Sequence, residues 1–65
     1  MITDPLTDRE RTVARLAGMA FTNQQIASQL GISPHTVNYH LRQIFRKLAI
    51  SSRVSLAPYA DPQHH

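Results

Sequence analysis

A turn signal near the middle of the chain constrains its fold more than any other feature. Gly31, Ser33 and Pro34 lie within four residues of one another and separate two stretches in which apolar residues recur at helical spacing. Glycine adopts the left-handed backbone that commonly ends a helix, serine caps the start of a helix, and proline suits the first turn. The sequence therefore predicts two helices joined by a tight turn, and the second of them covers residues 34–48.

Both predicted helices have one apolar face. The first opens with Thr22 and Gln25, which have the spacing of a capping box, and its inward residues are Ile26, Ala27 and Leu30. In the second, apolar residues recur at i, i+4, i+7 and i+11, namely Val37, Leu41, Ile44 and Leu48. Ala27 leaves room where the two helices cross, and Val37 fills the space between them. This arrangement is a helix-turn-helix, whose second helix is normally laid in the major groove of DNA.

The N-terminal part predicts a helix that starts in the same way. Thr7 and Glu10 form a second capping box, and acidic side chains in the first turn suit the positive end of the helix dipole. No strong stop signal follows, so we expect this helix to end at Gly18 or at Ala20. Its buried stripe is expected to consist of Val13, Leu16, Ala17 and Ala20.

The C-terminal part predicts a short fourth helix. Ser51 and Ser52 cap this helix, and Pro58 limits it to about two turns. Its apolar residues are Val54 and Leu56. No stretch has the alternation of a strand, so we expect an all-α fold with a three-helical core and a short fourth helix. The chain then divides into a lead-in or linker at 1–6, a helix-turn-helix domain at 7–57 and a loose C-terminal tail at 58–65.

Composition limits what else the chain can be. Its 65 residues suffice for one domain, and the absence of cysteine excludes disulfides and a cysteine-based zinc site. Its apolar runs are far shorter than the roughly 18 residues that a membrane span needs, and no charged-then-apolar segment resembles a secretion signal. We therefore expect a soluble protein with no membrane partner.

Charge is distributed unevenly along the chain. Three of the four acidic residues lie within the first ten residues, and there is no acid between residues 11 and 60. A basic stretch of this kind attracts polyanions, and the sequence pI of about 10.2 agrees with that. We expect Arg11, Arg15 and Arg53 to be solvated or paired within the domain. The other basic residues of this stretch are Arg42, Arg46 and Lys47.

The outward face of the second motif helix carries side chains that suit base recognition. At about 100° per residue, Asn38, Tyr39 and Arg42 lie away from the apolar face, together with His35 and Arg46. Arg42 matches the O6 and N7 acceptors of guanine as a fork, and Asn38 can pair with N6 and N7 of adenine. Tyr39 offers a ring to a thymine methyl group or a hydroxyl to a phosphate. A helical hairpin that serves only for packing would not need this polar face.

Four stretches spread over all four predicted helices match the pattern of one family. They are LTDRERTVARLA, TNQQIASQLGIS, TVNYHLRQIFRKLAISSR and the following Leu56. Together they resemble the LuxR-type, or GerE-like, DNA-binding domain over Leu6 to about Ala57. The resemblance implies a four-helix fold that binds double-stranded DNA as the output domain of a bacterial transcription regulator, often a response regulator. It also implies a cytoplasmic, nucleoid-associated protein that dimerises through the fourth helix, and a chain cut from a longer regulator.

The resemblance also implies roles for the positions that match the family pattern. The positions of Asn38, Tyr39 and Arg42 point at bases. The phosphate contacts fall into two groups of residues. One group lies at the start of the helix that follows Thr22, and the other lies on the second helix of the motif, at residues 34–48. Free amides and the helix dipole make the first group suitable for an anion independently of the family. The phosphate-contacting residues are Thr22, Asn23, Gln24, His35, Thr36, Arg46 and Lys47.

The chain departs from the family pattern at several positions. Asn38 stands where a lysine is common, and Gln25 replaces a usual glutamate, which preserves the cap but removes a charge. Ala20 and Ala49 stand where glycine usually ends a helix; if the backbone there has a positive φ, each alanine costs on the order of 1 kcal/mol. Pro58 falls within the usual course of the fourth helix and weakens the expectation of tight self-association.

Two other interpretations of the motif stay open at this point. The promoter-reading region 4 of sigma factors has a similar helix-turn-helix and would add RNA polymerase as a partner, although KLAISSR before a short fourth helix favours the LuxR type. Alternatively, the fold serves as a protein–protein interaction module, which the unusual Asn38 and the short fourth helix would suit. Catalysis and a cofactor are not expected, because no nucleophile set and no Gly-rich phosphate loop is present. A metal is not expected either, because His35 and His40 are five residues apart, whereas paired ligands on a helix are four apart.

Overall fold

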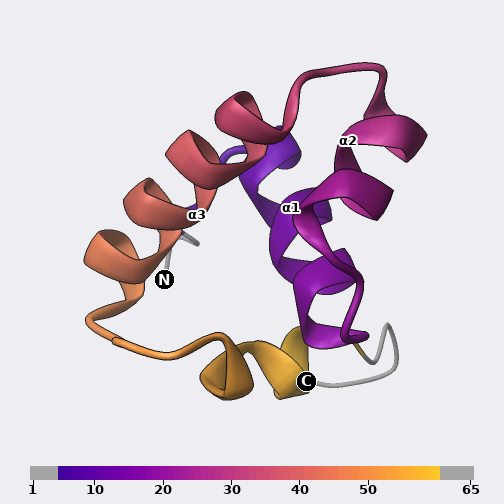
Figure 1. The fold of residues 1–65 in the computed structure, drawn as a ribbon. Helices are drawn as coiled ribbons and strands as arrows, with labels where there is room; N and C mark the ends of the chain where they lie inside the picture. Colours follow the sequence, from indigo (N-terminus) through magenta and orange to yellow (C-terminus); the bar gives the residue numbers. More distant parts are fainter. Residues whose placement is uncertain (1–4, 61–65) are drawn as a thin grey trace.

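The computed structural model describes residues 5–60, and in this range the chain forms four helices and no strand (Figure 1). In Figure 1, α3 and α2 lie on either side of α1, and the fourth helix, η1, closes one end of the molecule. The all-α fold is therefore confirmed, as are the predicted bounds of α3. The elements are α1 (Asp8–Gly18), α2 (Asn23–Leu30), α3 (Pro34–Leu48) and the 3-10 helix η1 (Arg53–Ala60).

Each of the three α-helices begins at the cap that the sequence predicts. In α1 and α2, the side chain of the third helical residue also accepts from the backbone N–H of the cap, so both capping boxes are closed. Local side-chain chemistry therefore decides where these helices start. The cap hydroxyls accept backbone N–H groups at 3.1 Å in three pairs: Thr7 from Glu10, Thr22 from Gln25 and Ser33 from Thr36.

Residues with left-handed backbone end α2 and α3, and another one turns the chain after α1. Gly31 ends α2 with φ 68°, Ala49 ends α3 with φ 56°, and Ala20 follows α1 with φ 69°. Because a Cβ opposes this conformation, each alanine costs on the order of 1 kcal/mol relative to glycine. Helix α1 ends at Gly18, and Ala20 is exposed in the turn beyond it. The prediction that Ala20 belongs to the buried stripe is therefore wrong, because the left-handed turn takes it out of the helix.

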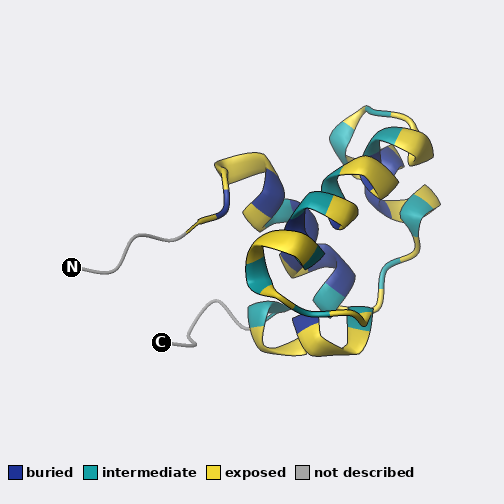
Figure 2. Cartoon of the chain, turned by 90° about the vertical axis from the view of Figure 1, so that its left-hand side faces the viewer, coloured by how far each residue is buried: buried dark blue, intermediate teal, exposed yellow. Residues whose placement is uncertain are grey.

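Every helix contributes to a single core. The largest fully buried side chains are Val13 of α1, Ile26 of α2, Val37 and Ile44 of α3, and Leu56 of η1. Figure 2 shows the buried faces of the helices turned toward one another inside the molecule. Burial of a side chain of this size stabilises the fold by roughly 1.5–3 kcal/mol, so a few residues supply much of the stability of such a short chain.

The fourth helix differs from its prediction in type and in length. It is a 3-10 helix, and it continues through Pro58 to Ala60. A 3-10 helix can include a proline because the fixed φ of proline, about −65°, lies in the range of 3-10 backbone. The predicted tail at 58–65 is therefore wrong for its first three residues, and its remainder lies outside the described residues, as do residues 1–4.

Close contact between backbones holds η1 on α1. A Cβ at Gly18 would overlap the carbonyl oxygen of Leu56 and would lie 3.3 Å from the backbone nitrogen of Ala60. Gly18 is therefore required by the packing of η1. Within residues 5–60, no helix is long and apolar enough to cross a membrane.

Candidate nucleic-acid interface

Helix α3 separates its buried residues from its polar ones. Val37, Leu41 and Ile44 are buried against the other helices. Because successive residues turn by about 100°, Asn38, Tyr39 and Arg42 lie on the side of the helix away from these residues. The predicted base contacts are all exposed, with Tyr39 at 59%, and so are three of the phosphate contacts predicted on this helix. These exposed residues are His35, Asn38, Tyr39, Arg42, Arg46 and Lys47.

The arginines of this face have no negative partner in the described part of the chain. Neither Arg42 nor Arg46 makes an ion pair or a side-chain hydrogen bond within residues 5–60. The two acids of that range, Asp8 and Glu10, both belong to the first turn of α1. The charge of the outward face is therefore uncompensated, which favours contact with a polyanion.

Lys47, a predicted phosphate contact, is engaged within the molecule. Its Nζ lies 2.7 Å from Oε1 of Glu10, whose side chain is only 7% exposed, whereas that of Lys47 is 32% exposed. Burial opposes the charge of Glu10, but the hydrogen bonds from Lys47 and from the backbone N–H of Thr7 outweigh it and lower the pKa of Glu10. The last turn of α3 is thus tied to the first turn of α1.

The N-terminus of α2 lies open on one side and is held on the other. Thr22 and Gln24 are exposed, whereas Asn23 is half-buried. The Oδ1 of Asn23 accepts from Nη1 of Arg53, and the carbonyl oxygen of Phe21 accepts from Nη2, both at 2.6 Å. Arg53 is thus paired within the domain, as expected, but its partners lie about thirty residues away, and nothing in the local sequence announces them.

The first turn of α3 holds the remaining predicted phosphate contact. The hydroxyl of Thr36 lies 3.0 Å from that of Ser33, and Thr36 is half-buried. About one turn further along α3, the rings of Tyr39 and His40 meet edge to face, with centroids 5.8 Å apart. The ring of Tyr39 is therefore steadied on one side while most of it faces solvent.

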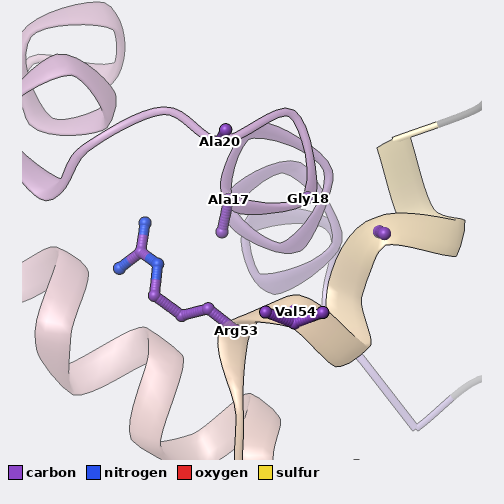
Figure 3. A pocket seen from close by; sticks show the side chains of 6 residues that line it. Ala17, Gly18, Ala20, Arg53 and Val54 are labelled. Carbon is purple, nitrogen blue, oxygen red and sulfur yellow. The ribbon is translucent and has the colours of Figure 1, made fainter.

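An apolar pocket lies apart from this face, between α1 and η1 (Figure 3). Val54, which is 81% exposed, stands at its edge. The side chain of Arg53 extends from η1 toward the segment between α1 and α2. The remaining lining residues are small: Ala17, Gly18, Ala20 and Ala57.

The chain is similar in sequence to bacterial regulatory proteins. The chain is 50% identical over 52 residues to the nitrate/nitrite response regulator protein homolog of Haemophilus influenzae, which covers 80% of this chain and 25% of that protein. It is 44% identical over 54 residues to the transcriptional regulatory protein UhpA of Escherichia coli, covering 83% of this chain and 28% of UhpA. The chain therefore spans about a quarter of the length of these relatives. No solved structure matched it.

A family model matches the whole helical part of the chain that the structure describes. The family described as "Bacterial regulatory proteins, luxR family" (GerE) matches residues 4–60, which include all four helices. This chain belongs to the LuxR family and carries its helix-turn-helix DNA-binding domain.

Proposed function

We propose that this chain reads a specific double-stranded DNA sequence, with α3 in the major groove, as the output domain of a bacterial transcription regulator. The observation that carries the proposal is the outward face of α3, where Asn38, Tyr39 and Arg42 are exposed and neither Arg42 nor the neighbouring Arg46 has an ion-pair partner within residues 5–60. Such a domain acts on the chromosome, which places the protein in the cytoplasm and on the nucleoid when it is bound. The relatives named as regulators support this role for the chain.

Three residues of α3 read bases in this proposal. Arg42 takes the O6 and N7 of a guanine with two N–H groups, and Asn38 pairs with the N6 and N7 of an adenine. Tyr39 packs its ring against a thymine methyl group or reaches a phosphate. These contacts specify the sequence, whereas the phosphate contacts fix the orientation of the domain.

Phosphate contacts come from both helices of the motif. Backbone N–H groups and the dipole at the start of α2 suit one phosphate, and Arg46 suits another. Lys47 gives one of its three donors to Glu10, so we expect a smaller contribution from it than from Arg46. The proposed phosphate contacts are Thr22, Asn23, Gln24, His35, Thr36, Arg46 and Lys47.

Two copies of the domain pair on DNA through η1 in this proposal. The exposed Val54 beside an apolar pocket supports pairing by this surface, and the short 3-10 helix favours pairing that depends on DNA over a stable free dimer. A dimer of this kind reads two half-sites related by two-fold symmetry. RNA polymerase is the protein partner that the bound dimer contacts, and a pull-down with polymerase core on an operator duplex tests that contact.

Selection of bound duplexes from a random pool tests the function most widely. The proposal predicts a consensus with two-fold symmetry and guanine at the position read by Arg42. A pool that stays random, while the protein binds all duplexes equally, contradicts sequence-specific recognition. No salt-dependent binding to any duplex would favour an interaction module that has lost DNA binding.

A further inference from the structure

The guanidinium of Arg53 holds both sides of the residue that caps α2. It donates to the carbonyl oxygen of Phe21, before the cap, and to Oδ1 of Asn23, after the cap, at 2.6 Å each. Both hydrogen bonds are partly buried, and Figure 3 shows the extended side chain reaching across from η1. One arginine thus links η1, thirty residues later in the chain, to the phosphate-facing end of α2.

This contact decides which way the Asn23 amide faces. A guanidinium has donors only, so the amide must turn its oxygen toward Arg53. Its NH2 group then faces the opposite way, as a donor with no partner among residues 5–60. A donor held in one orientation suits a phosphate oxygen beside the backbone N–H groups of the helix terminus.

The contact also leaves the charge of Arg53 uncompensated. Its two acceptors are neutral, and no acid lies between residues 11 and 60. The positive charge therefore adds to the dipole at the N-terminus of α2. We propose that Arg53 is a positioning residue for DNA binding, which holds the Asn23 amide with its NH2 group toward a phosphate. This inference rests on the proposed function.

A double-variant cycle with the 65-residue chain tests this role. We would measure the anisotropy of a labelled, mixed-sequence duplex of about 20 base pairs with Arg53→Met, Asn23→Ala and the double variant, at two salt concentrations. Arg15→Met is the matched control, because it removes one positive charge from an exposed position on α1. Circular dichroism and thermal melting of each variant show whether it is folded.

The expected result separates positioning from charge. Asn23→Ala should weaken binding by about tenfold, because it removes a hydrogen bond to a charged phosphate. Arg53→Met should weaken binding by about the same factor, because it removes one positive charge and frees the Asn23 amide from its orientation. In the Asn23→Ala background, Arg53→Met should lower the DNA affinity only about two- to threefold, which is the loss expected for the charge control Arg15→Met. The two effects are not additive, because Arg53 acts through the Asn23 side chain that it contacts. Arg53→Lys should restore only the two- to threefold affinity that the positive charge contributes, because an ammonium group lacks the fork of donors that spans both acceptors.

The Asn23 side chain gives a second readout that does not depend on the variants' stability. Its NH2 resonances in an NMR spectrum of the wild-type chain should shift when the duplex is added. Multiplicative losses in the double variant, full rescue by Arg53→Lys or unmoved NH2 resonances would overturn the role of Arg53 while DNA binding stands. Absence of wild-type binding at both salt concentrations would overturn the proposed function itself.

Discussion

Helices α1 and α2 start with the same capping box but differ in one charge. In α1 the third helical residue is Glu10, and in α2 it is Gln25; both accept from the cap's N–H, at 2.9 and 2.8 Å. Glu10 is buried and paired with Lys47, whereas Gln25 is exposed and neutral. The two boxes have nearly the same hydrogen-bond geometry and opposite electrostatic settings.

The difference shows what each helix end serves. The carboxylate at α1 satisfies the helix dipole and a lysine within the molecule, so that end is complete without a partner. The amide at α2 closes the cap without cancelling the dipole, so that end keeps its attraction for an anion. The region around Glu10 should therefore govern stability, and the region formed by the start of α2 and the outward face of α3 should govern DNA binding.

The largest effect is expected at Arg42, in the second region. Arg42→Ala should weaken binding to the selected operator by about 1–3 kcal/mol and relax the preference at one base pair, because a bidentate contact is lost. Its unfolding free energy should stay within about 0.5 kcal/mol of the wild type, because the side chain is exposed. Fluorescence anisotropy with operator and random duplexes measures the DNA affinity, and urea denaturation measures the free energy of unfolding. Equal loss on both duplexes would contradict base reading by Arg42.

Glu10→Gln gives α1 the neutral box of α2 and tests the first region. It should lower the unfolding free energy by about 1–2 kcal/mol in urea denaturation at neutral pH, because Lys47 loses its carboxylate in a partly buried site. DNA affinity should not fall, because the carboxylate offsets a positive charge. Weaker DNA binding with unchanged stability would reverse the assignment of the two regions.

The pH dependence of stability should report the same carboxylate. The pKa of Glu10 is lowered from its ordinary 4.5, so the folded chain takes up this proton at lower pH than the unfolded chain. The contribution of the carboxylate is fully present above the ordinary value and is lost as the pH falls through the lowered one. The gap between wild type and Glu10→Gln should be constant from pH 7 to about pH 5 and close below it. A gap that widens on acidification would mean that the carboxylate is destabilised in the fold.

The smallest effect is expected when α2 receives the charge of α1. Gln25→Glu keeps the capping geometry and should leave stability equal or slightly higher, because a carboxylate suits the positive end of the dipole. Affinity for a mixed-sequence duplex should fall about two- to threefold at low salt, and the difference should shrink at high salt. Unchanged affinity at low salt would show that the neutral side chain of Gln25 does not contribute to DNA binding.

Local signals in the sequence predict much of this fold. The hydroxyls of Thr7, Thr22 and Ser33 act on backbone within three residues, so the starts of the α-helices could be found without knowing the fold. The exposed face of α3 follows from the apolar period on its other side. The roles of Asn38, Tyr39 and Arg42 in reading bases stay predictions.

Features that depend on distant residues could not be found in the same way. The pair of Glu10 and Lys47 joins residues 37 apart, and the contacts of Arg53 span thirty and more, so only the packed structure brings them together. The course of η1 through Pro58 depends on its packing against Gly18. Charge could be located by sequence alone, but its partners could not.

Chemical-shift mapping with a DNA duplex tests the central claim most directly. If the outward face of α3 enters the groove, the resonances of Asn38, Tyr39 and Arg42 shift on titration, together with those at the start of α2. Resonances of the first turn of α1, around Glu10, should stay in place. Shifts confined to α1 or to η1, with α3 unmoved, would contradict the proposed interface.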